Sequence, residues 1–351
     1  MPPARETTWG VGCWQTSQLD ELIAMASTAE RCGFDHFWYG NEKLHPDMWV
    51  GLTAAAIHST RLRIGSFVAD PYSCHPAAAT AAIATIDAYS GGRAILLLGA
   101  GGAGLRELGI ERRRPLATLE AAVRVARGLL RGDHVSYDGD VFSVDASLHF
   151  AARPDLPIWL AGRAPGVLEL AGRVADGAMV GTIARPRAIA AALDQVRAGV
   201  ARAGRSPEDV RLSVRVDVSI GDDGRAARNA LRGFVAGILS ASFPDRSFVE
   251  SNGLEVPEEL EAVCKTKDLE LAWRSGHLVP DAFVDAFAWA GTAEEVAASV
   301  AAAIECGVND VTVMFHPGAG APARQLEVFA NEVVPRVAAL RGQSIGTPEH
   351  A

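Results

Sequence analysis

The glycines of residues 94–109 are the first feature of the sequence that suggests chemistry. The stretch reads AILLLGAGGAGLRELG, and Gly99, Gly101 and Gly104 have the G-x-G-x-x-G spacing that can mark a dinucleotide-binding turn. Such a turn should follow the first strand of its domain and precede, by about 20 residues, an acidic residue at a strand end. Here the motif lies in the fourth strand unit, and Glu120 falls inside a predicted helix. We therefore expect these glycines to let a flat ligand approach the backbone, with a plain sharp turn as the alternative.

A second group of small residues follows a later predicted strand. It reads AGRAPG and comprises Ala161, Gly162, Arg163, Ala164, Pro165 and Gly166. Small residues before a helix let backbone N–H groups face an anion, and the guanidinium of Arg163 adds a charge-assisted contact. This pattern predicts a phosphate-binding loop, and an ordinary strand-to-helix turn is the alternative.

Few side chains are placed to transfer a proton. Glu42 follows the predicted strand 34–40, where it is either a proton donor or a solvated loop carboxylate. His75 lies at the exit of the third predicted strand, on the expected rim of a barrel site. His36 lies inside a strand and is expected to have a structural role. His316 follows the last predicted strand in the stretch HPGAGAP, where ligand contact and an incidental position are both open.

No other motif competes with these groups. The sequence has no G-x-S-x-G elbow, no P-loop and no H-E-x-x-H helix. Its cysteines are scattered and form neither a C-x-x-C pair nor a zinc-like cluster: Cys13, Cys32, Cys74, Cys264 and Cys306. We expect reduced thiols and no metal site.

Composition narrows the class of ligand. The chain has 33 Lys and Arg against 42 Asp and Glu, and its net charge of -9 argues against a nucleic-acid or anionic-membrane partner. No apolar run approaches the ~20 residues of a membrane-spanning helix, and the start lacks the long apolar segment of a secretion signal. We expect a cytoplasmic protein that binds a small molecule.

The order of elements predicts an α/β fold, a (β/α)8 TIM barrel. Short β-rich runs alternate with longer Ala-, Leu- and Arg-rich stretches, which is typical of βαβ units around a parallel sheet. Eight such units in 351 residues favour a barrel over an open doubly wound sheet. The predicted strands are 7–13, 34–40, 62–68, 93–99, 156–162, 177–181, 210–220 and 310–315. The predicted helices are 17–32, 47–59, 76–90, 114–131, 165–174, 185–203, 222–239 and 321–341.

Two stretches do not fit the alternation. Residues 132–156 alternate aromatic and polar side chains, which predicts a small hairpin before the fifth strand. Residues from about 240 to 290 predict a helical insertion between the seventh and eighth units. Insertions in barrels commonly lie after strands, where substrates bind, so this one is a candidate for substrate specificity. We treat 1–351 as one barrel domain with a short flexible tail at 342–351.

Segments over nearly the whole chain resemble one protein family. They include GFDHFWYGNE, LRIGSFVADPYSC, RPLATLEAAVRVARGLLRG, LPIWLAGRAPG and AWAGTAEEVAASV, in the family's order. The sequence resembles the bacterial-luciferase-like flavin and deazaflavin oxidoreductases. Among these it is most similar to the branch of the coenzyme F420-dependent methylenetetrahydromethanopterin reductase.

The resemblance implies that a flavin or deazaflavin ring lies at the carboxyl ends of the barrel strands. It implies a cis peptide bond between Phe67 and Val68 behind the ring, and it assigns the phosphate to the AGRAPG loop. The remaining implied cofactor contacts are Gly99, Ala100, Gly101, Gly102, Val180 and Gly181. Four tryptophans are candidates to wall a ring pocket: Trp14, Trp38, Trp49 and Trp159.

The chain departs from the family at two positions that handle protons. Deazaflavin-using relatives often carry Asp-His at the end of the second strand, and this chain has Asn41 and Glu42. An acidic residue common after the fourth strand is replaced by Gly102. Our predicted catalytic residues are Asn41, Glu42 and His75.

These observations lead to three functional hypotheses. The first is a coenzyme F420-dependent oxidoreductase that transfers a hydride between the deazaflavin and a small organic substrate. The second is an FMN-dependent monooxygenase of the same superfamily, and the third is a barrel that binds a flavin or another ligand without turnover. The resemblance also suggests a homodimer or a larger homo-oligomer.

Overall fold

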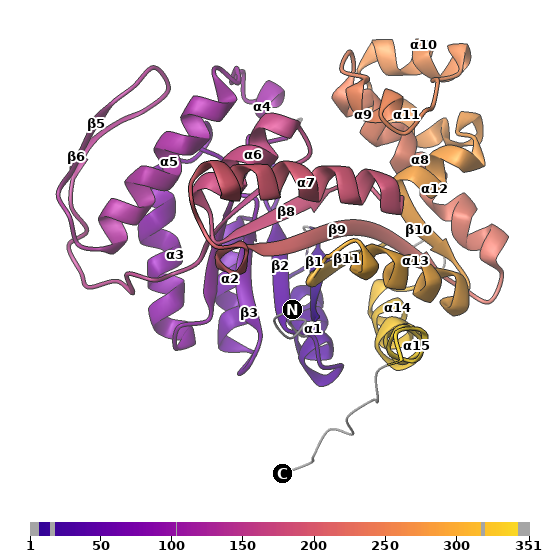
Figure 1. Cartoon of the computed structure of the whole chain (residues 1–351), viewed down its shortest axis with the longest axis horizontal. Helices are drawn as coiled ribbons and strands as arrows, with labels where there is room; N and C mark the ends of the chain where they lie inside the picture. Colours follow the sequence, from indigo (N-terminus) through magenta and orange to yellow (C-terminus); the bar gives the residue numbers. More distant parts are fainter. Residues whose placement is uncertain (1–6, 15–17, 103, 317–319, 343–351) are drawn as a thin grey trace.

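The computed structural model describes residues 7–14, 18–102, 104–316 and 320–342. Within them, eight parallel strands close into a barrel surrounded by helices, which confirms the predicted TIM barrel (Figure 1). The barrel strands are β1 (Thr8–Cys13), β2 (His36–Gly40), β3 (Arg63–Phe67), β4 (Ala94–Leu98), β7 (Ile158–Gly162), β8 (Gly177–Gly181), β9 (Arg211–Ile220) and β11 (Asp310–Phe315). The helices between them are α1 (Leu19–Arg31), α2 (Met48–Ile57), α3 (Pro76–Ser90), α4 (Gly104–Glu107), α5 (Pro115–Leu130), α6 (Pro165–Val174), α7 (Pro186–Arg202), α8 (Gly224–Ser242) and α13 (Ala293–Glu305).

Local sequence signals set the ends of several helices. Pro76, Pro115 and Pro186 occupy the first turns of α3, α5 and α7, where a missing N–H costs no hydrogen bond. The Asp47 carboxylate caps α2 by accepting hydrogen bonds from two backbone N–H groups. Gly91 ends α3 with a φ of 70°, a conformation that glycine adopts without a Cβ clash.

The last predicted helix is interrupted. Residues predicted as one helix over 321–341 form α14 (Pro322–Val328), a π-helical turn (Phe329–Val333) and α15 (Val334–Leu340). Pro335 lies in the first turn of α15, and a proline cannot donate the helical hydrogen bond that a continuous helix needs there. Residues 343–351 of the predicted tail lie outside the described ranges.

Strand β9 joins the barrel to the insertion. Its first half pairs with β8, from Arg211 opposite Gly177 to Arg215 opposite Gly181. Its second half pairs with a short strand, β10 (Ala288–Gly291). This strand was not predicted, because four residues at the end of a helical stretch carry too little periodicity to distinguish a strand.

The insertion is helical, as predicted, and has its own apolar core. Its elements are α9 (Ser247–Glu250), α10 (Glu258–Thr266), α11 (Leu269–Arg274), the 3-10 turn η2 (Gly276–Leu278) and α12 (Asp281–Phe287). Val235 of α8, Leu260 of α10 and Phe287 of α12 are fully buried in this core. Figure 1 shows α9, α10 and α11 gathered beside the end of α8, away from α1 and α3. The predicted hairpin is also present as β5 (Val135–Asp138) and β6 (Ser143–Ala146).

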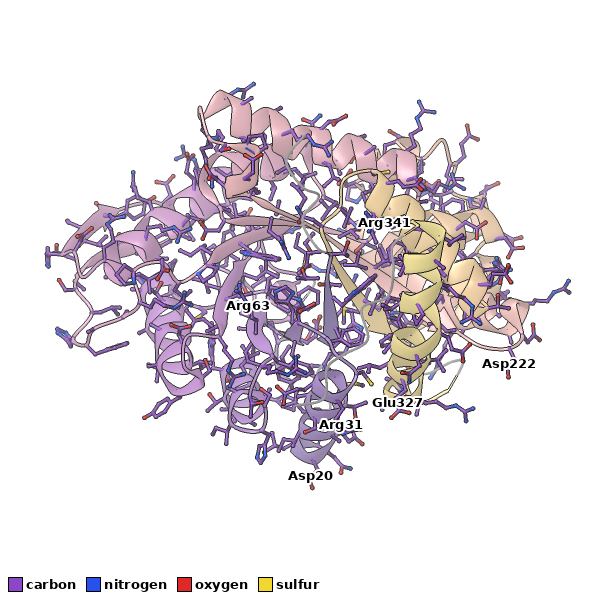
Figure 2. All side chains as sticks on the ribbon, turned by 60° about the horizontal axis from the view of Figure 1, so that its bottom comes forward. Asp20, Arg31, Arg63, Asp222, Glu327 and Arg341 are labelled. Atoms are coloured by element: carbon purple, nitrogen blue, oxygen red, sulfur yellow. The ribbon has the colours of Figure 1, made fainter. Side chains whose placement is uncertain are left out.

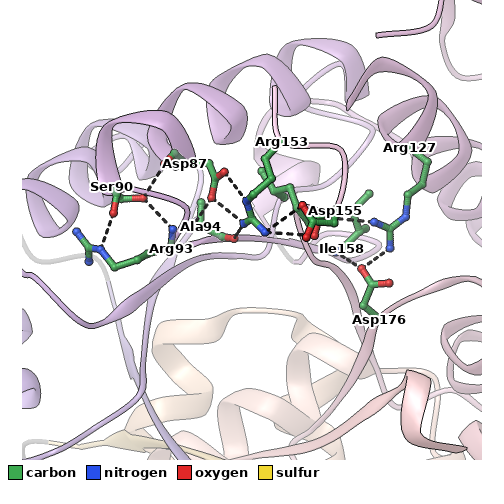
Figure 3. Close-up of polar contacts among 10 residues, drawn as sticks. Asp87, Ser90, Arg93, Ala94, Arg127, Arg153, Asp155, Ile158 and Asp176 are labelled. Atoms are coloured by element: carbon green, nitrogen blue, oxygen red, sulfur yellow. Dashed lines mark hydrogen bonds and ion pairs between the residues drawn. The ribbon is translucent and has the colours of Figure 1, made fainter. Parts of the chain in front are cut away.

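Charged side chains fix the amino-terminal ends of β4 and β7 (Figure 3). Asp87 of α3 accepts a hydrogen bond from the first N–H of β4 and pairs with Arg153 at 2.8 Å between Nε and Oδ2. Asp176 accepts a hydrogen bond from the N–H of Ile158 at 2.7 Å and pairs with Arg127. These contacts lie at the end of the barrel opposite to the carboxyl ends, where barrel residues commonly serve stability.

Helices α1 and α14 lie side by side in the outer ring. Arg31 of α1 and Glu327 of α14, both labelled in Figure 2, are 4.0 Å apart between Nη2 and Oε1. None of the helices in the described ranges has the length and apolar composition needed to cross a bilayer.

Candidate active site at the carboxyl ends of the barrel strands

The end of β3 bends sharply against β2 and β4. The peptide bond between Phe67 and Val68 is cis, as the resemblance led us to expect. The amide of Asn41 donates to the Val68 carbonyl at 3.1 Å, and its backbone N–H donates to the Phe67 carbonyl at 3.1 Å. A Cβ on Gly99 would lie 2.8 Å from Val68 Cγ2. Asn41 and Gly99 therefore hold this segment from two sides, and the contacts of Asn41 are those of a positioning residue.

The glycine turn after β4 leaves space beside it. Gly101 has a φ of 75°, and a Cβ there would lie 2.6 Å from Leu105 Cδ1. A Cβ on Gly102 would meet no atom within 4 Å. Ala100, which stands between Gly99 and Gly101, is half-buried. The turn therefore presents backbone, with open space at Gly102, toward the barrel mouth.

A buried ion pair supports this turn. Lys43 Nζ lies 2.7 Å from Asp70 Oδ2, and Asp70 also accepts hydrogen bonds from the backbone N–H and hydroxyl of Ser73. Burial by itself would raise the pKa of Asp70, but the bonds from Lys43 and Ser73 outweigh it and hold that pKa below its ordinary value. Asp70 is thus a charged support for the turn, and sequence reasoning did not single it out.

The AGRAPG loop connects β7 to α6, as predicted. A Cβ on Gly162 would lie 2.6 Å from Val167 Cγ1, so the loop packs closely on the first turn of α6. The helix begins after Ala164 with no side-chain cap, and Pro165 occupies its first turn. Gly166 follows inside that turn and packs near Leu116. Backbone N–H groups at this end are therefore not covered by a capping side chain.

Arg163 contacts the insertion as well as this loop. Its guanidinium hydrogen-bonds Ser242 Oγ at the end of α8 and lies 4.1 Å from the Phe248 ring centroid. Burial lowers the pKa of Arg163, and the positive charge of Arg112 lowers it further, against the attraction of Asp245. Arg112 also donates to the Gly101 carbonyl at 3.3 Å. Arg112 thus lies at the glycine turn and Arg163 at the loop before α6, near enough for their charges to act on each other.

The contacts of His75 and Val180 limit the roles predicted for them, whereas Gly181 borders open space. His75 caps α3 by accepting from the Ala77 N–H, and its Nε2 donates to the Ser143 carbonyl at 2.8 Å. Both of its ring nitrogens therefore serve local structure. The Val180 side chain lies in the core between barrel and helices, since alternate strand residues face opposite sides. Gly181 follows it, and a Cβ there would meet no atom within 4 Å.

Glu42 lies at the mouth of the barrel with an exposed side chain. Its negative charge acts on Arg215, where it partly opposes the effect of burial on the pKa of that guanidinium. Glu42 is therefore near enough to Arg215 for its charge to act there, and its catalytic role stays a prediction.

A buried group of three side chains lies on β9 and directly after β11, and the sequence analysis singled out only His316 among them. Arg215 Nη1 lies 2.7 Å from Asp217 Oδ2, and its Nη2 donates to Asp217 Oδ1 at 2.9 Å. His316 Nε2 lies 2.7 Å from the same Oδ1. The strand RLSVRVDVSI alternates polar and apolar residues with period two. In a barrel, this alternation turns the polar side chains toward the interior. It was the feature of the sequence from which these inward-facing charges could have been predicted.

Tryptophans form the floor beneath this mouth. Trp38 and Trp159 are buried inside the barrel with their ring centroids 5.3 Å apart, together with Met179. Trp14 lies above, 5.4 Å from the Arg215 guanidinium carbon. Trp49 of α2 packs against the outer core. Trp14 is thus the tryptophan of this set that reaches the mouth.

The residues in the described ranges contain no group of three or more His, Cys, Asp or Glu side chains that could hold a metal ion. All five cysteines are described and unpaired.

The fold and the mouth at the strand ends define a luciferase-like barrel. Residues 7–310 match the luciferase-like monooxygenase family, which covers most of the chain. The protein belongs to this family and is an enzyme of the luciferase-like class.

Relatives of known function include methylenetetrahydromethanopterin reductases and dehydrogenases whose names specify coenzyme F420. The chain is 29% identical over 305 residues to the 5,10-methylenetetrahydromethanopterin reductase of Methanolobus tindarius, with 87% of this chain and 93% of the relative covered. It is 26% identical to the F420-dependent glucose-6-phosphate dehydrogenase of Rhodococcus erythropolis, with 91% and 94% covered.

Solved structures confirm the fold. The coenzyme F420-dependent tetrahydromethanopterin reductase from Methanopyrus kandleri matches with a TM-score of 0.84, 24% identity, and 95% of this chain and 99% of that chain covered. An F420-dependent secondary alcohol dehydrogenase, solved with an F420-acetone adduct, matches with a TM-score of 0.80, 22% identity and the same coverage. The monooxygenase RslO1 from Streptomyces bottropensis matches with a TM-score of 0.67 and 21% identity, covering 93% of this chain and 99% of that chain.

Proposed function

We propose that this protein is a coenzyme F420-dependent oxidoreductase that exchanges a hydride with an organic substrate at the barrel mouth. The observation that carries the proposal is a pair of guanidinium groups, Arg112 at the glycine turn and Arg163 just before the uncapped amino end of α6. Cations and helical N–H groups together favour a bound anion. The tail of coenzyme F420 carries a phosphodiester and several carboxylates, whereas FMN ends in one phosphate.

The residues at the mouth fit a flat ring joined to an anionic tail. Gly102 and Gly181 border space that a Cβ would enter without meeting another atom. Phe67 and Val68 pack against the buried cluster that contains Trp38 and Trp159. When bound, the deazaflavin would supply two electrons as a hydride, and the chain would position it and limit the access of water.

The names of the relatives support coenzyme F420 as the cofactor, but they do not indicate one substrate. Their names specify methylenetetrahydromethanopterin and glucose 6-phosphate, and one solved structure holds an acetone adduct. These substrates share little structure, so substrate choice must come from residues that vary around a common barrel. We propose that the insertion supplies them here, because Arg163 ties α8 and α9 to the end of β7.

The tail assignment predicts how single charges affect binding. Arg112→Met and Arg163→Met should each weaken F420 binding by about ten-fold or more, since each removes a charge-assisted hydrogen bond. Titration of F420 fluorescence measures this affinity. Arg114→Met is the matched control, because Arg114 belongs to the same basic stretch but pairs with Asp140 of the hairpin loop. Unchanged F420 affinity in both test variants would show that Arg112 and Arg163 do not bind the anionic tail of the cofactor.

A further inference from the structure

A cavity of about 800 Å³ opens where the last barrel strand meets the insertion. Its wall includes Asn229 and Phe234 of α8, Trp273 of α11, His277 of η2, and His316 after β11. Pockets of about 300–1,000 Å³ hold drug-sized ligands. A three-carbon alcohol would leave most of this cavity empty.

The cavity wall is closely packed. A Cβ on Gly233 would lie 2.5 Å from the Trp273 carbonyl oxygen, and a Cβ on Gly276 would lie 2.6 Å from the Gly233 nitrogen. These contacts fix α8 against α11 and η2. The Trp273 side chain is nevertheless 58% exposed while it lines the cavity. A large exposed aromatic on a fixed wall offers contact area to a ligand.

His316 is held in place at the inner end of this cavity. Its Nε2 donates to Asp217 Oδ1 at 2.7 Å, and its ring centroid lies 4.3 Å from that of Phe234. A carboxylate that binds one ring nitrogen fixes the tautomer and leaves the other nitrogen as a proton acceptor. Within the described part of the chain, Nδ1 of His316 has no protein partner.

The charges around His316 come from several elements. Asp217 is paired with Arg215 on β9, and Glu42 after β2 acts on Arg215 from the mouth. His277 of η2 also lines the cavity. Of the two arginines that line it, Arg232 of α8 pairs with Asp281 and Arg274 of α11 pairs with Glu270. The guanidinium of Arg215 thus lies beside the carboxylate that holds His316.

One side chain, Arg215, lies near both the cavity wall and the expected cofactor position. The Arg215 guanidinium carbon lies 5.7 Å from the Phe67 ring centroid and 6.0 Å from that of Phe234. Phe67 belongs to the segment behind the expected cofactor ring, and Phe234 belongs to the cavity wall.

We propose that His316 is the residue that exchanges a proton with substrate, and that the cavity binds a hydroxyl or carbonyl compound with a ring-sized apolar body. The proposal rests on the proposed F420-dependent function. In the alcohol-oxidising direction, the carbinol C–H bond breaks and its electron pair leaves with the hydrogen as hydride to oxidised coenzyme F420. The O–H bond breaks, its proton goes to Nδ1 of His316, and the carbon–oxygen double bond forms. Asp217 is a positioning residue for this step.

The binding part is tested without the cofactor. The probe is 4-phenyl-2-butanone, titrated into the full chain labelled with [15N]histidine. The ring signals of His316, assigned by their loss in His316→Gln, should shift and saturate, and acetone at the same concentration should shift them far less. Ala230→Trp, which places a large side chain in the cavity, should abolish the saturation. A probe that leaves the His316 signals unmoved would overturn the proposal.

The catalytic part is tested with F420 and 4-phenyl-2-butanol. His316→Ala should lower kcat by about 10²-fold or more, the usual range for loss of a general base. Added imidazole should restore part of the activity. Asp217→Asn should also lower kcat, without rescue by imidazole. The matched control is His134→Ala, which removes an exposed histidine that pairs with Asp145 on the hairpin, away from the cavity. It should change kcat by less than about three-fold, well short of a general-base effect. Full activity in His316→Ala would overturn the proposal.

The measurement of F420 affinity separates two kinds of failure. If the wild-type chain does not bind F420, the proposed function fails, while the histidine titration still decides whether the cavity takes the probe. If F420 binds to wild type and His316→Ala equally and the probe is not oxidised by either, the substrate class proposed for the cavity is wrong.

Discussion

Neighbouring glycines at the barrel mouth differ in what an added side chain would meet. Gly101 needs a positive φ and packs against Leu105 and Asp70, whereas Gly102 borders open space. The spacing of these glycines was visible in the sequence. Their different surroundings were not, because they depend on Asp70, which the fold brings to the turn from the end of β3.

This difference gives a paired prediction. Gly101→Ala should lower the free energy of unfolding by about 1–2 kcal/mol, the cost of a left-handed conformation for a residue with a Cβ. Gly102→Ala should leave stability unchanged and weaken F420 binding, since its methyl group enters the space assigned to the cofactor. Urea unfolding and F420 titration measure the two effects. Equal loss of stability in both variants would contradict the assigned geometry.

Residue types alone did not reveal the group at Arg215, Asp217 and His316. The sequence analysis placed Arg215 and Asp217 inside a predicted strand and assigned a role to neither. A charged residue in a strand is usually on a solvated face. Barrel closure reverses that expectation: it turns alternate positions of β9 inward, so Asp217 is completely buried. His316 was noticed, but its carboxylate partner lies 99 residues earlier in the sequence.

At the scale of elements, a polar cluster joins four strands near the amino-terminal end of the barrel interior. Asp310 of β11 pairs with His36 of β2 at 2.8 Å between Oδ2 and Nδ1, and it accepts hydrogen bonds from Thr8 of β1 and Ser213 of β9, each at 2.6 Å. The structural role expected for His36 is confirmed by this contact. The cluster links the first two strands of the barrel to its last two, which are adjacent in the closed barrel but far apart in the sequence.

Asp310 predicts a specific dependence of stability on pH. Burial would raise its pKa, but the charge and hydrogen bond of His36, with the bonds from Ser213 and Thr8, hold the pKa below its ordinary value. A lowered native pKa stabilises the fold above the unfolded value of about 3.9, and this contribution is lost as the pH falls through the native value.

Asp310→Asn should therefore destabilise the protein at pH 7 by about 3 kcal/mol, as expected when a buried ion pair is broken. The difference from wild type should shrink as the pH falls below about 4. Urea unfolding at a series of pH values measures it. Ser147→Ala, at a half-buried position directly after the hairpin, is the control. A difference that stays constant from neutral to acid pH would show that the charge of Asp310 is not responsible.

The elements themselves were largely predictable, because each strand and helix carries a local period and proline or glycine signals at its ends. Two features escaped that reasoning. Strand β10 is too short to show a period, and it forms because β9 extends beyond β8 and leaves an edge to be paired. The π-helical turn in the last helix comes directly before Pro335, and its Phe329 packs against Trp9 and Phe315; the proline was visible in the sequence, but the packing was not.

For the whole molecule, the expectation of a homo-oligomer stays a prediction, and α2 is the surface we assign to it. This helix is apolar around its circumference, which is unusual for a helix with one face in water. Val50 and Ile57 lie seven residues apart on one face and are 63% and 69% exposed. We expect a second copy of the chain to cover them.

The combined variant Val50→Asp and Ile57→Asp should be monomeric under conditions in which wild type is dimeric, because the charges would be buried without partners. Sedimentation velocity measures the state. Leu340→Asp, on α15, removes a similarly exposed leucine and should leave the dimer intact. A wild-type chain that is monomeric at micromolar concentration would exclude this assembly.

The central claim is that the barrel mouth binds coenzyme F420 for hydride transfer. The most direct measurement is a parallel titration of the same protein with F420 and with FMN, followed by fluorescence. We predict that F420 binds at least about ten-fold more tightly, because its longer anionic tail reaches both Arg112 and Arg163 and gains charge-assisted contacts. Tighter binding of FMN, with oxygen consumption by the reduced complex, would contradict the claim and favour a monooxygenase.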